Sequence, residues 1–491
     1  MAISGIPGLG SGMDVRGMVD ALIQAESAPK TAQLDRLEKT TTSKVSALGQ
    51  FRSALSTFET ALGKLNDSSL FEKRSATSSA ADIVSITADS KAVAGKYNVQ
   101  VFNLAQTSKV ALAGFDNASD ALGTGSLTIN VGDESLNIEV GEGNNSLTGI
   151  RDAINAAGKE MGLSATIVND PSGEGGARLV LSSTESGTDA DISVAVSGAT
   201  GELGTLAFAP QSGTEADFQP TPVDADNPRA ARVISYSRDA NFAIDGINLS
   251  SASNTVEDAI EGVTLTLKAA QSQEALENAE TVNLGVAVDK AGVKKSITDF
   301  VDAYNKMLDS VNALTNVTPI ADGNADPLAA ALVGDASVRS FMSAMRSELG
   351  SPASGEGIRI LADLGISTQR DGKLAVDNTK LDKALDTNFE QVNAFFTGDQ
   401  GLMARLENKV KPYTETGGVL DNRTKALQNT LTGPGGVDDQ RESLTARLTK
   451  LESRLLAQFN AMDALVSQMS STSSFLTAQL DSLPGVVKKD T

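Results

Sequence analysis

Apolar residues recur at heptad spacing near both ends of this 491-residue chain. In the N-terminal part they step alternately by three and four positions, which indicates a helix with one apolar stripe. That stripe comprises Leu48, Phe51, Leu55, Phe58, Leu62 and Leu65, and the polar run Asn66–Asp67–Ser68 marks its end. A helix with a single apolar face must lay it against a partner, so a long partnered helix is expected here.

Two further stripes have the same period. One runs from Val293 to Leu314, and we expect it to pack in an intramolecular helical bundle. The other lies near the C-terminus and comprises Leu444, Leu448, Leu451, Leu455, Phe459, Met462, Val466 and Met469. The segment "TLTGPGGVDDQ" (430–440) should interrupt the helical region before it. The terminal stripes are rich in Ser, Thr, Gln and Ala, which favours self-association or docking over a helix that is stable alone.

Between residues 77 and 289 the period changes to two, the pattern of β-strands. "YNVQVFNLA" places Tyr97, Val99 and Val101 on one face, and "SLTINVGDESLNIEV" indicates a hairpin. "NFAIDGINLS" predicts a second hairpin with an Asp245–Gly246 turn. A short helix with Ser146 as its N-cap is expected in "SLTGIRDAINAAG". The fold class is therefore α+β and multidomain, with long terminal helices in a coiled-coil or bundle leg that enclose an inserted β-rich head of two domains.

Composition removes most catalytic chemistry. The chain has no His and no Cys, so Ser-His-Asp and Cys-His catalysis, thiolate zinc sites and disulfides are excluded. Its net charge of −21 and the lack of a Lys/Arg stripe argue against nucleic acid and anionic membranes as partners. No run of about 18 apolar residues is present that could span a bilayer. Catalysis by carboxylates, Lys or Tyr, or at a hard-cation site, stays open, but the usual catalytic residues are missing, and we expect neither an enzyme nor a bound cofactor or metal.

The glycine-rich start of the chain raises the question of a phosphate cradle. Gly8, Gly10, Ser11 and Gly12 precede an amphipathic run, but Met13 stands where a dinucleotide fingerprint needs glycine. No strand precedes the glycines and no Lys-Ser pair follows them. A mobile leader is the better interpretation. The same start lacks the basic and apolar regions of a Sec-type signal, which predicts either a cytoplasmic protein or export by another route.

Two acidic segments, residues 224–227 and 322–327, are candidate calcium loops by composition. An EF-hand starting at Asp322 would need Glu at its twelfth position, where the chain has Val333. Paired carboxylates for glycoside hydrolysis are equally unspecific among 62 acidic residues, with no Trp to form a sugar platform. The two acidic segments, residues 224–227 and 322–327, are predicted to be surface loops.

Several segments, in order along the whole chain, resemble the bacterial flagellar filament cap family, also called hook-associated protein 2. The N-terminal "GLGSGMDVRGMVDALIQAESAP" is similar to the family's signature, which contains Gly8, Gly10, Ser11 and Gly12. "GKYNVQVFNLAQ" and "FAIDGINLSSASNTVEDAIEGVTLTL" resemble its two head motifs, and residues 146–183 resemble a flagellin-type insertion motif. "LADLGISTQRDGKLAVD" and "QFNAMDALVSQMSSTSSFLTAQL" resemble its C-terminal half.

This resemblance implies a structural protein that forms a homo-oligomeric ring at the distal tip of the flagellar filament. There it would promote folding and insertion of exported flagellin and prevent its leakage. The implied partners are further copies of the chain, flagellin, the distal filament end, hook–filament junction proteins, and the export apparatus with its chaperone. Nucleic acid and membrane insertion are not implied. The implied location is extracellular, reached by the flagellar type III route without a cleaved signal peptide.

The resemblance also implies a division of the chain. Residues 1–45 and 441–491 would be terminal segments, mobile when free and coiled-coil on assembly. Residues 46–76 and 290–440 would form a helical leg, 77–112 with 236–289 a β-rich head domain, and 113–235 a second, inserted head domain. Two alternatives stay open: a surface adhesin that uses the β-rich head for mucin or host attachment, and another flagellar axial protein.

Overall fold

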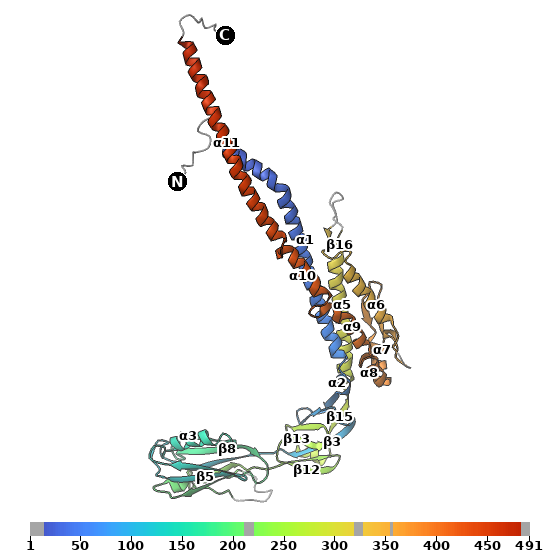
Figure 1. Ribbon diagram of the computed structural model, residues 1–491. Helices are drawn as coiled ribbons and strands as arrows, with labels where there is room; N and C mark the ends of the chain where they lie inside the picture. Colours follow the sequence, from blue (N-terminus) through green and yellow to red (C-terminus); the bar gives the residue numbers. More distant parts are fainter. Residues whose placement is uncertain (1–13, 211–219, 319–327, 354–356, 483–491) are drawn as a thin grey trace. The chain divides into compact units, whose positions relative to one another are not determined.

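The computed structural model describes residues 14–210, 220–318, 328–353 and 357–482 (Figure 1). The candidate signature Gly8, Gly10, Ser11 and Gly12 and the acidic segment 322–327 lie outside the described residues. The chain divides into two compact units. The helical unit comprises Met1–Leu70 and Ala291–Thr491, and the β unit comprises Phe71–Lys290.

The helical unit is built around one long helix, α1, which covers Val15–Leu65. Asp14 caps its first turn, because the Asp14 carboxylate accepts a 2.8 Å hydrogen bond from the N–H of Gly17. Its C-terminal end falls where the polar run predicts it, with Asn66 as the C-cap. The other helices in the described part are α2 (Ser69–Glu72), α5 (Lys290–Thr315), α6 (Ala336–Gly350), α7 (Asn378–Thr387), α8 (Phe389–Phe396), α9 (Leu402–Thr414), α10 (Val419–Thr432), α11 (Val437–Asp481) and the 3₁₀ turn Leu361–Leu364.

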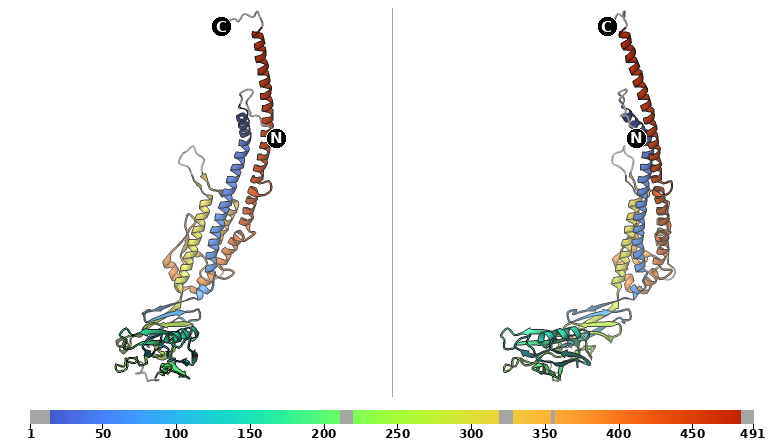
Figure 2. Two further views of the ribbon diagram at one scale, coloured as in Figure 1. Left: turned by 90° about the vertical axis from the view of Figure 1, so that its left-hand side faces the viewer. Right: turned by 60° about the vertical axis from the view of Figure 1, so that its left-hand side comes forward.

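Two small antiparallel ribbons complete this unit. β16 (Val317–Thr318) pairs with β17 (Leu328–Ala329), and β18 (Ile366–Thr368) pairs with β19 (Leu374–Val376). The break predicted within residues 430–440 is confirmed, since α10 ends at Thr432 and α11 begins at Val437. Figure 2 shows α1 and α11 side by side.

The N-terminal heptad stripe forms the core of the helical unit. All six of its side chains are at most 1% exposed. Phe51 meets Phe341 of α6 edge-on, with ring centroids 5.6 Å apart, and Phe58 lies 6.0 Å from Phe300 and 6.1 Å from Tyr304 of α5. The stripe predicted on α5 is buried as well, from Val293 to Val311. The heptad spacing therefore predicts the faces that meet in this core.

The described residues of the β unit form four antiparallel sheets. Two have strand orders β1-β15-β3-β11-β12 and β13-β14-β2, and the other two have β10-β4-β8-β7 and β6-β5-β9. The strands are β1 (Arg74–Ser78), β2 (Val84–Ala88), β3 (Gly95–Asn103), β4 (Thr107–Phe115), β5 (Gly125–Val131), β6 (Glu134–Val140), β7 (Leu163–Asn169), β8 (Ala177–Ser186), β9 (Ile192–Ser197), β10 (Arg232–Ser235), β11 (Ala240–Ile244), β12 (Ile247–Ser251), β13 (Thr255–Ile260), β14 (Val263–Leu267) and β15 (Val282–Val288). Short helices accompany them in the described part: α3 (Leu147–Ala157), α4 (Gln273–Glu277) and the 3₁₀ turn Leu203–Leu206.

The side chains of the β unit fall into two hydrophobic clusters. One is centred on Val99, Val101 and Phe242 and holds residues from Val84 to Val286. The other surrounds α3 and holds residues from Val110 to Val233. Strand β4 passes through the expected domain boundary at residue 112, with Val110 in the second cluster. The four-part division of the chain given above stays a prediction.

The local motifs predicted in this unit are confirmed. β5 pairs with β6 so that Leu127 faces Ile138 and Ile129 faces Leu136. β11 and β12 are joined by Asp245 and Gly246, whose φ angles of 49° and 82° suit the two-residue turn of a twisted hairpin. The Asp245 carboxylate also accepts hydrogen bonds from the Asn98 backbone and side chain at 3.0 and 2.9 Å. Ser146 caps α3 through the N–H of Gly149.

Replacement of Phe58 by Ala tests the core of the helical unit. Removing a fully buried ring leaves a cavity, and we expect the free energy of unfolding to fall by about 3–5 kcal/mol. Urea unfolding followed by circular dichroism at the helical band measures it. Phe475→Ala is the matched control, because Phe475 is 63% exposed on α11 of the same unit, and it should cost less than about 1 kcal/mol. Equal losses for the two variants would contradict this assignment of the core.

Candidate assembly surface

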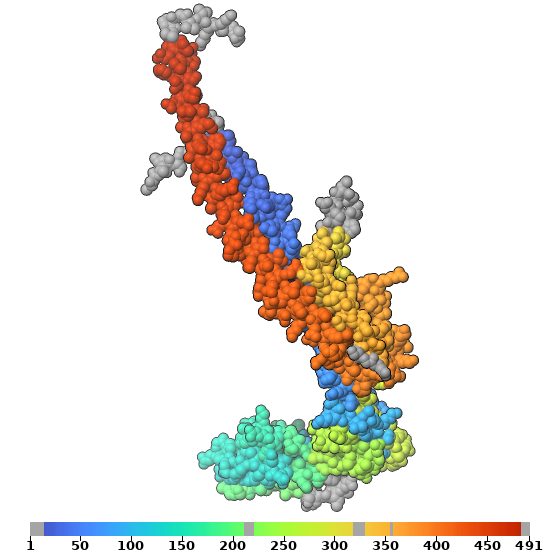
Figure 3. Space-filling model, turned by 45° about the vertical axis from the view of Figure 1, so that its right-hand side comes forward, coloured from blue at the N-terminus to red at the C-terminus, as the bar shows by residue number. Residues whose placement is uncertain are grey.

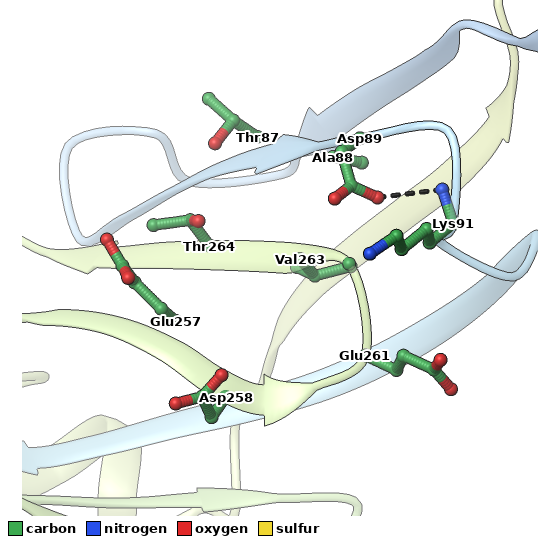
Figure 4. Close-up of a pocket in the computed structure, with 10 residues that line it drawn as sticks. Thr87, Ala88, Asp89, Lys91, Glu257, Asp258, Glu261, Val263 and Thr264 are labelled. Atoms are coloured by element: carbon green, nitrogen blue, oxygen red, sulfur yellow. Dashed lines mark hydrogen bonds between the residues drawn. The ribbon is translucent and has the colours of Figure 1, made fainter.

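Among the described residues of the β unit, the cavities are lined mainly by strand residues and carboxylates. One of about 650 Å³ is lined by Asp89, Glu257, Asp258 and Glu261, with Lys91 among them (Figure 4). Asp89 is used structurally, because its carboxylate accepts the backbone N–H of Lys91 at 2.7 Å. Among the residues that the structure describes, no group of three or more His, Cys, Asp or Glu side chains could hold a metal ion.

The acidic segment 224–227 is an exposed bend. The Asp224 carboxylate accepts the backbone N–H groups of Asp226 and Asn227, at 2.9 and 3.2 Å, so it closes its own turn. Over the same described ranges, no helix is both long enough and apolar enough to cross a membrane.

The two predicted sets of heptad residues have different surroundings in the structure. The six side chains from Leu48 to Leu65 are covered by other helices of the same chain. They therefore belong to the core of the helical unit, and their expected part in assembly stays a prediction. The C-terminal set is less covered: Leu444, Leu448, Leu451, Leu455 and Phe459 are half-buried, whereas Met462, Val466 and Met469 are 47%, 37% and 66% exposed.

The partner of the first part of α11 is the first part of α1, and the two helices run antiparallel. Arg441 of α11 forms ion pairs with Asp35 and Glu38 of α1, while Arg447, further along α11, pairs with Glu26, which is earlier in α1. The two carboxylates raise the pKa of Arg441, Asp35 having the larger effect. Val15 and Val19, near the start of α1, are fully buried.

The last part of α11 carries an apolar stripe that the described residues leave exposed. Figure 3 shows this end of α11 extending beyond α1. Its members, which we call the distal stripe, are Met462, Leu465, Val466, Met469, Leu476 and Leu480. Phe475, which is 63% exposed, lies beside it. Exposed apolar faces of this kind are typical of surfaces that pack against another helix, because a lone helix in water is marginally stable.

The heptad analysis includes Met462, Val466 and Met469 of the distal stripe, and their role in assembly stays a prediction. Leu465 and Phe475 lie off the alternating three-and-four steps and were not expected to contribute. Val15 and Val19 were also missed, although their spacing of four residues is a helical signal. The periodicity shows which residues share a face. It does not show which stretch of α11 is covered by α1.

A partly buried ion pair fixes α6 against α10. Asp335 caps α6 by accepting the backbone N–H groups of Ser337 and Val338, and it binds Arg423 of α10 through two hydrogen bonds of 2.8 and 2.6 Å. The Asp335 side chain is 10% exposed and that of Arg423 is 37% exposed. The hydrogen bond from Arg423, with the backbone donors, holds the pKa of Asp335 below its usual value despite burial. The same hydrogen bond raises the pKa of Arg423.

Comparisons with known proteins cover almost the whole chain. The family model described as flagellar hook-associated protein 2 C-terminus matches residues 237–471, and the model of the N-terminus matches residues 11–108. The flagellin hook IN motif matches residues 126–185.

Relatives of similar length were found as well. The A-type flagellar hook-associated protein 2 of Pseudomonas aeruginosa is 42% identical, over 99% of this chain and 98% of its own length. The B-type protein of that species is 44% identical over 97% of each chain. Among solved structures, the D1-D2-D3 domains of the flagellar cap protein from Escherichia coli match with a TM-score of 0.58 and 27% identity, over 78% of this chain and 99% of theirs.

Replacement of Asp335 by Asn tests the link between α6 and α10. Asn retains a capping oxygen but loses the charge that binds Arg423. Because Arg423 is partly solvated, we expect the free energy of unfolding, measured with urea, to fall by about 1–2 kcal/mol. Asp382→Asn is the control: Asp382 pairs with Lys294 but is 53% exposed, so its loss should be under about 1 kcal/mol.

The same pair predicts a pH dependence. The folded-state pKa of Asp335 is lowered, so its stabilisation is fully present above the unfolded-state pKa of about 3.9 and is lost as the pH falls through the folded value. The difference in free energy of unfolding between the wild type and Asp335→Asn should therefore disappear as the pH falls below about 4. A difference between the two proteins that is constant from neutral to strongly acidic pH would contradict this.

Proposed function

This chain belongs to the flagellar hook-associated protein 2 family, and from that premise we propose that it forms the cap at the distal tip of a flagellar filament. The observation that carries the proposal on this chain's own residues is the distal stripe. A helix that exposes Met462, Val466 and Met469 needs a helical partner outside the described residues. The filament end and neighbouring cap subunits would supply such helices.

The proposed mechanism assigns separate roles to the core and to the terminal helices of the helical unit. The helical unit, with its buried core, is the rigid leg, and the terminal helices α1 and α11 are its foot in the filament. Several copies form a ring through which exported flagellin is folded, inserted and kept from leaking. The chain reaches this place by the flagellar type III export route, with its chaperone, and meets the hook–filament junction proteins at the start of growth.

The architecture supports a structural role in this proposal. The family is one of structural cap proteins, and the helical unit is made of long helices whose contacts are apolar, aromatic and ionic. A ring requires an interface in which one surface of a subunit meets a different surface of the next, and long helices presented at one end of a rigid core suit that arrangement.

Deletion of the gene in its own host tests the proposal. We expect short filaments and monomeric flagellin in the spent medium, both corrected by the full chain but not by a chain lacking residues 1–45. Filament length by electron microscopy and flagellin in the medium by immunoblot are the measurements. Normal filaments without leakage would contradict the cap function and favour an adhesin.

The distal stripe can be tested separately. The double variant Met462→Asp, Met469→Asp places two charges on the exposed stripe, and we expect it to fold normally but to fail to restore filament growth. The expected loss is at least tenfold, because each carboxylate would have to be desolvated in a helix–helix contact. The double variant Ser471→Asp, Ser474→Asp adds the same two charges at exposed positions on the face of α11 away from the stripe, so it is the matched control and should restore growth. Full activity of the variant Met462→Asp, Met469→Asp would show that the stripe is not the contact.

A further inference from the structure

Open edges of the sheets in the β unit are places where a second chain can add a strand. An edge strand presents a row of unpaired N–H and C=O groups, and natural proteins cover or charge such edges. Among the described residues, the two sheets around α3 end in the strands β10, β7, β6 and β9. The backbone groups on the outer side of these four strands therefore need partners or protection.

Three of these edges are partly covered by residues from turns and loops. On β9, Val194 exchanges two backbone hydrogen bonds of 2.7 and 2.8 Å with Phe208. On β10, the carbonyl of Val233 accepts the N–H of Thr221 at 2.9 Å. On β6, the side-chain amide of Asn144 donates to a backbone carbonyl at 3.0 Å. Covering the outer backbone of an edge strand is thus a repeated feature of this part of the chain.

The edge of β7 is covered by one side chain of α3. The amide of Asn155 donates a hydrogen bond to the backbone carbonyl of Ala165, and its side-chain carbonyl accepts the N–H of Ala165, both at 2.8 Å. Successive residues of an antiparallel strand bond to opposite sides, and Ala165 directs both of its groups away from β8. The amide of Asn155 therefore occupies the position that a peptide group of a further strand would take.

The end of α3 covers the edge next to Asn155. The N–H of Leu163, the first residue of β7, donates to the carbonyl of Gly158 at 2.9 Å. A Cβ at residue 158 would lie 3.0 Å from the carbonyl oxygen of Leu163, so glycine allows this close approach. Further along the strand, Ile167 is the next residue whose backbone faces outward, and the side chain of Val168 is 49% exposed. Asn155 thus lies where the covered part of the edge ends.

We propose that Asn155 blocks the addition of a second copy of β7 to the edge of this sheet. Without the amide, Ala165 and Ile167 would present outward N–H and C=O groups, which an identical strand running antiparallel about a two-fold axis can match. The occupant of an uncovered edge is therefore β7 of another copy of this chain. With the edge covered, copies meet at this edge through side chains instead. The value of the block in a ring of neighbouring copies rests on the proposed function, whereas the block itself does not.

A single substitution opens this edge. Asn155→Ala removes both hydrogen bonds and retains α3, because alanine is the best helix former. In the full chain we expect Asn155→Ala to self-associate, with a weight-average mass that rises towards twice the wild-type value at the same concentration. Sedimentation velocity over a range of concentrations measures the mass, and circular dichroism verifies the fold. A mass equal to that of the wild type at every concentration would overturn the proposal.

Two further variants separate the open edge from the mere loss of hydrogen bonds. Asn254 makes the same pair of bonds with Ala105, at 2.8 and 2.9 Å, but Ala105 lies between β3 and β4 and not in an edge strand. Asn254→Ala should therefore keep the wild-type mass. Adding Val168→Lys to Asn155→Ala places a charge on the opened strand and should restore the wild-type mass, because charged edge strands resist pairing. Equal association of Asn254→Ala, or association unchanged by Val168→Lys, would count against the block.

Hydrogen exchange distinguishes strand addition from a loss of local structure. In dilute Asn155→Ala the N–H of Ala165 has lost its acceptor, and its exchange should be about five- to tenfold faster than in the wild type. At high concentration the added strand accepts this N–H, so exchange should slow again. Mass spectrometry of peptides that cover β7 measures both rates. Exchange that stays fast at every concentration would reduce Asn155 to a local contact and overturn the block, while the cap function is tested separately by the deletion strain.

Discussion

The packing of Phe58 against Phe300 and Tyr304 joins the two halves of the helical unit, and the rest of that unit depends on it. The stripe from Leu48 to Leu65 comes before the β unit in the sequence, and α5 follows it. Closing this core therefore brings together segments separated by the whole of Phe71–Lys290. The entropy of loop closure grows only slowly with length, and a folded β unit shortens the effective loop further. An insertion of this size between two helices is thus compatible with a stable helical core.

The elements that the sequence predicts well are those decided by local patterns. The heptad steps of α1 and α5 identify the buried faces because a helix repeats every 3.6 residues, whatever it packs against. The Asp245–Gly246 hairpin follows from a turn that needs two positive φ angles, and the Ser146 cap follows from the unpaired N–H groups of a helix start. In each case the physical cause acts within a few residues, so the sequence contains it.

Features that depend on distant partners could not be predicted. Asp335 and Arg423 are 88 residues apart, and nothing in a chain with 62 acidic residues singles out that carboxylate before α6 and α10 are placed together. The exposure of the distal stripe could not be predicted either. The spacing places Met462 and Met469 on one face, but whether that face is covered depends on the register of α1 on α11. Pro29 lies in a segment expected to be mobile when free, and the structure places it inside a helix.

Burial changes along α1, and so does the kind of contact that holds this helix to the rest of its unit. From Leu48 to Leu65 the helix is held by fully buried leucine and phenylalanine side chains, each of which contributes about 1.5–3 kcal/mol by its burial. Between Val19 and Leu34 no side chain is buried, and the Glu26–Arg447 ion pair in that stretch is exposed and worth about 0–1 kcal/mol. The two stretches of α1 therefore differ in what holds them to the rest of the unit. The aromatic and aliphatic contacts from Leu48 to Leu65 depend on burial, whereas the exposed ion pair at Glu26 depends on charge and is screened by salt.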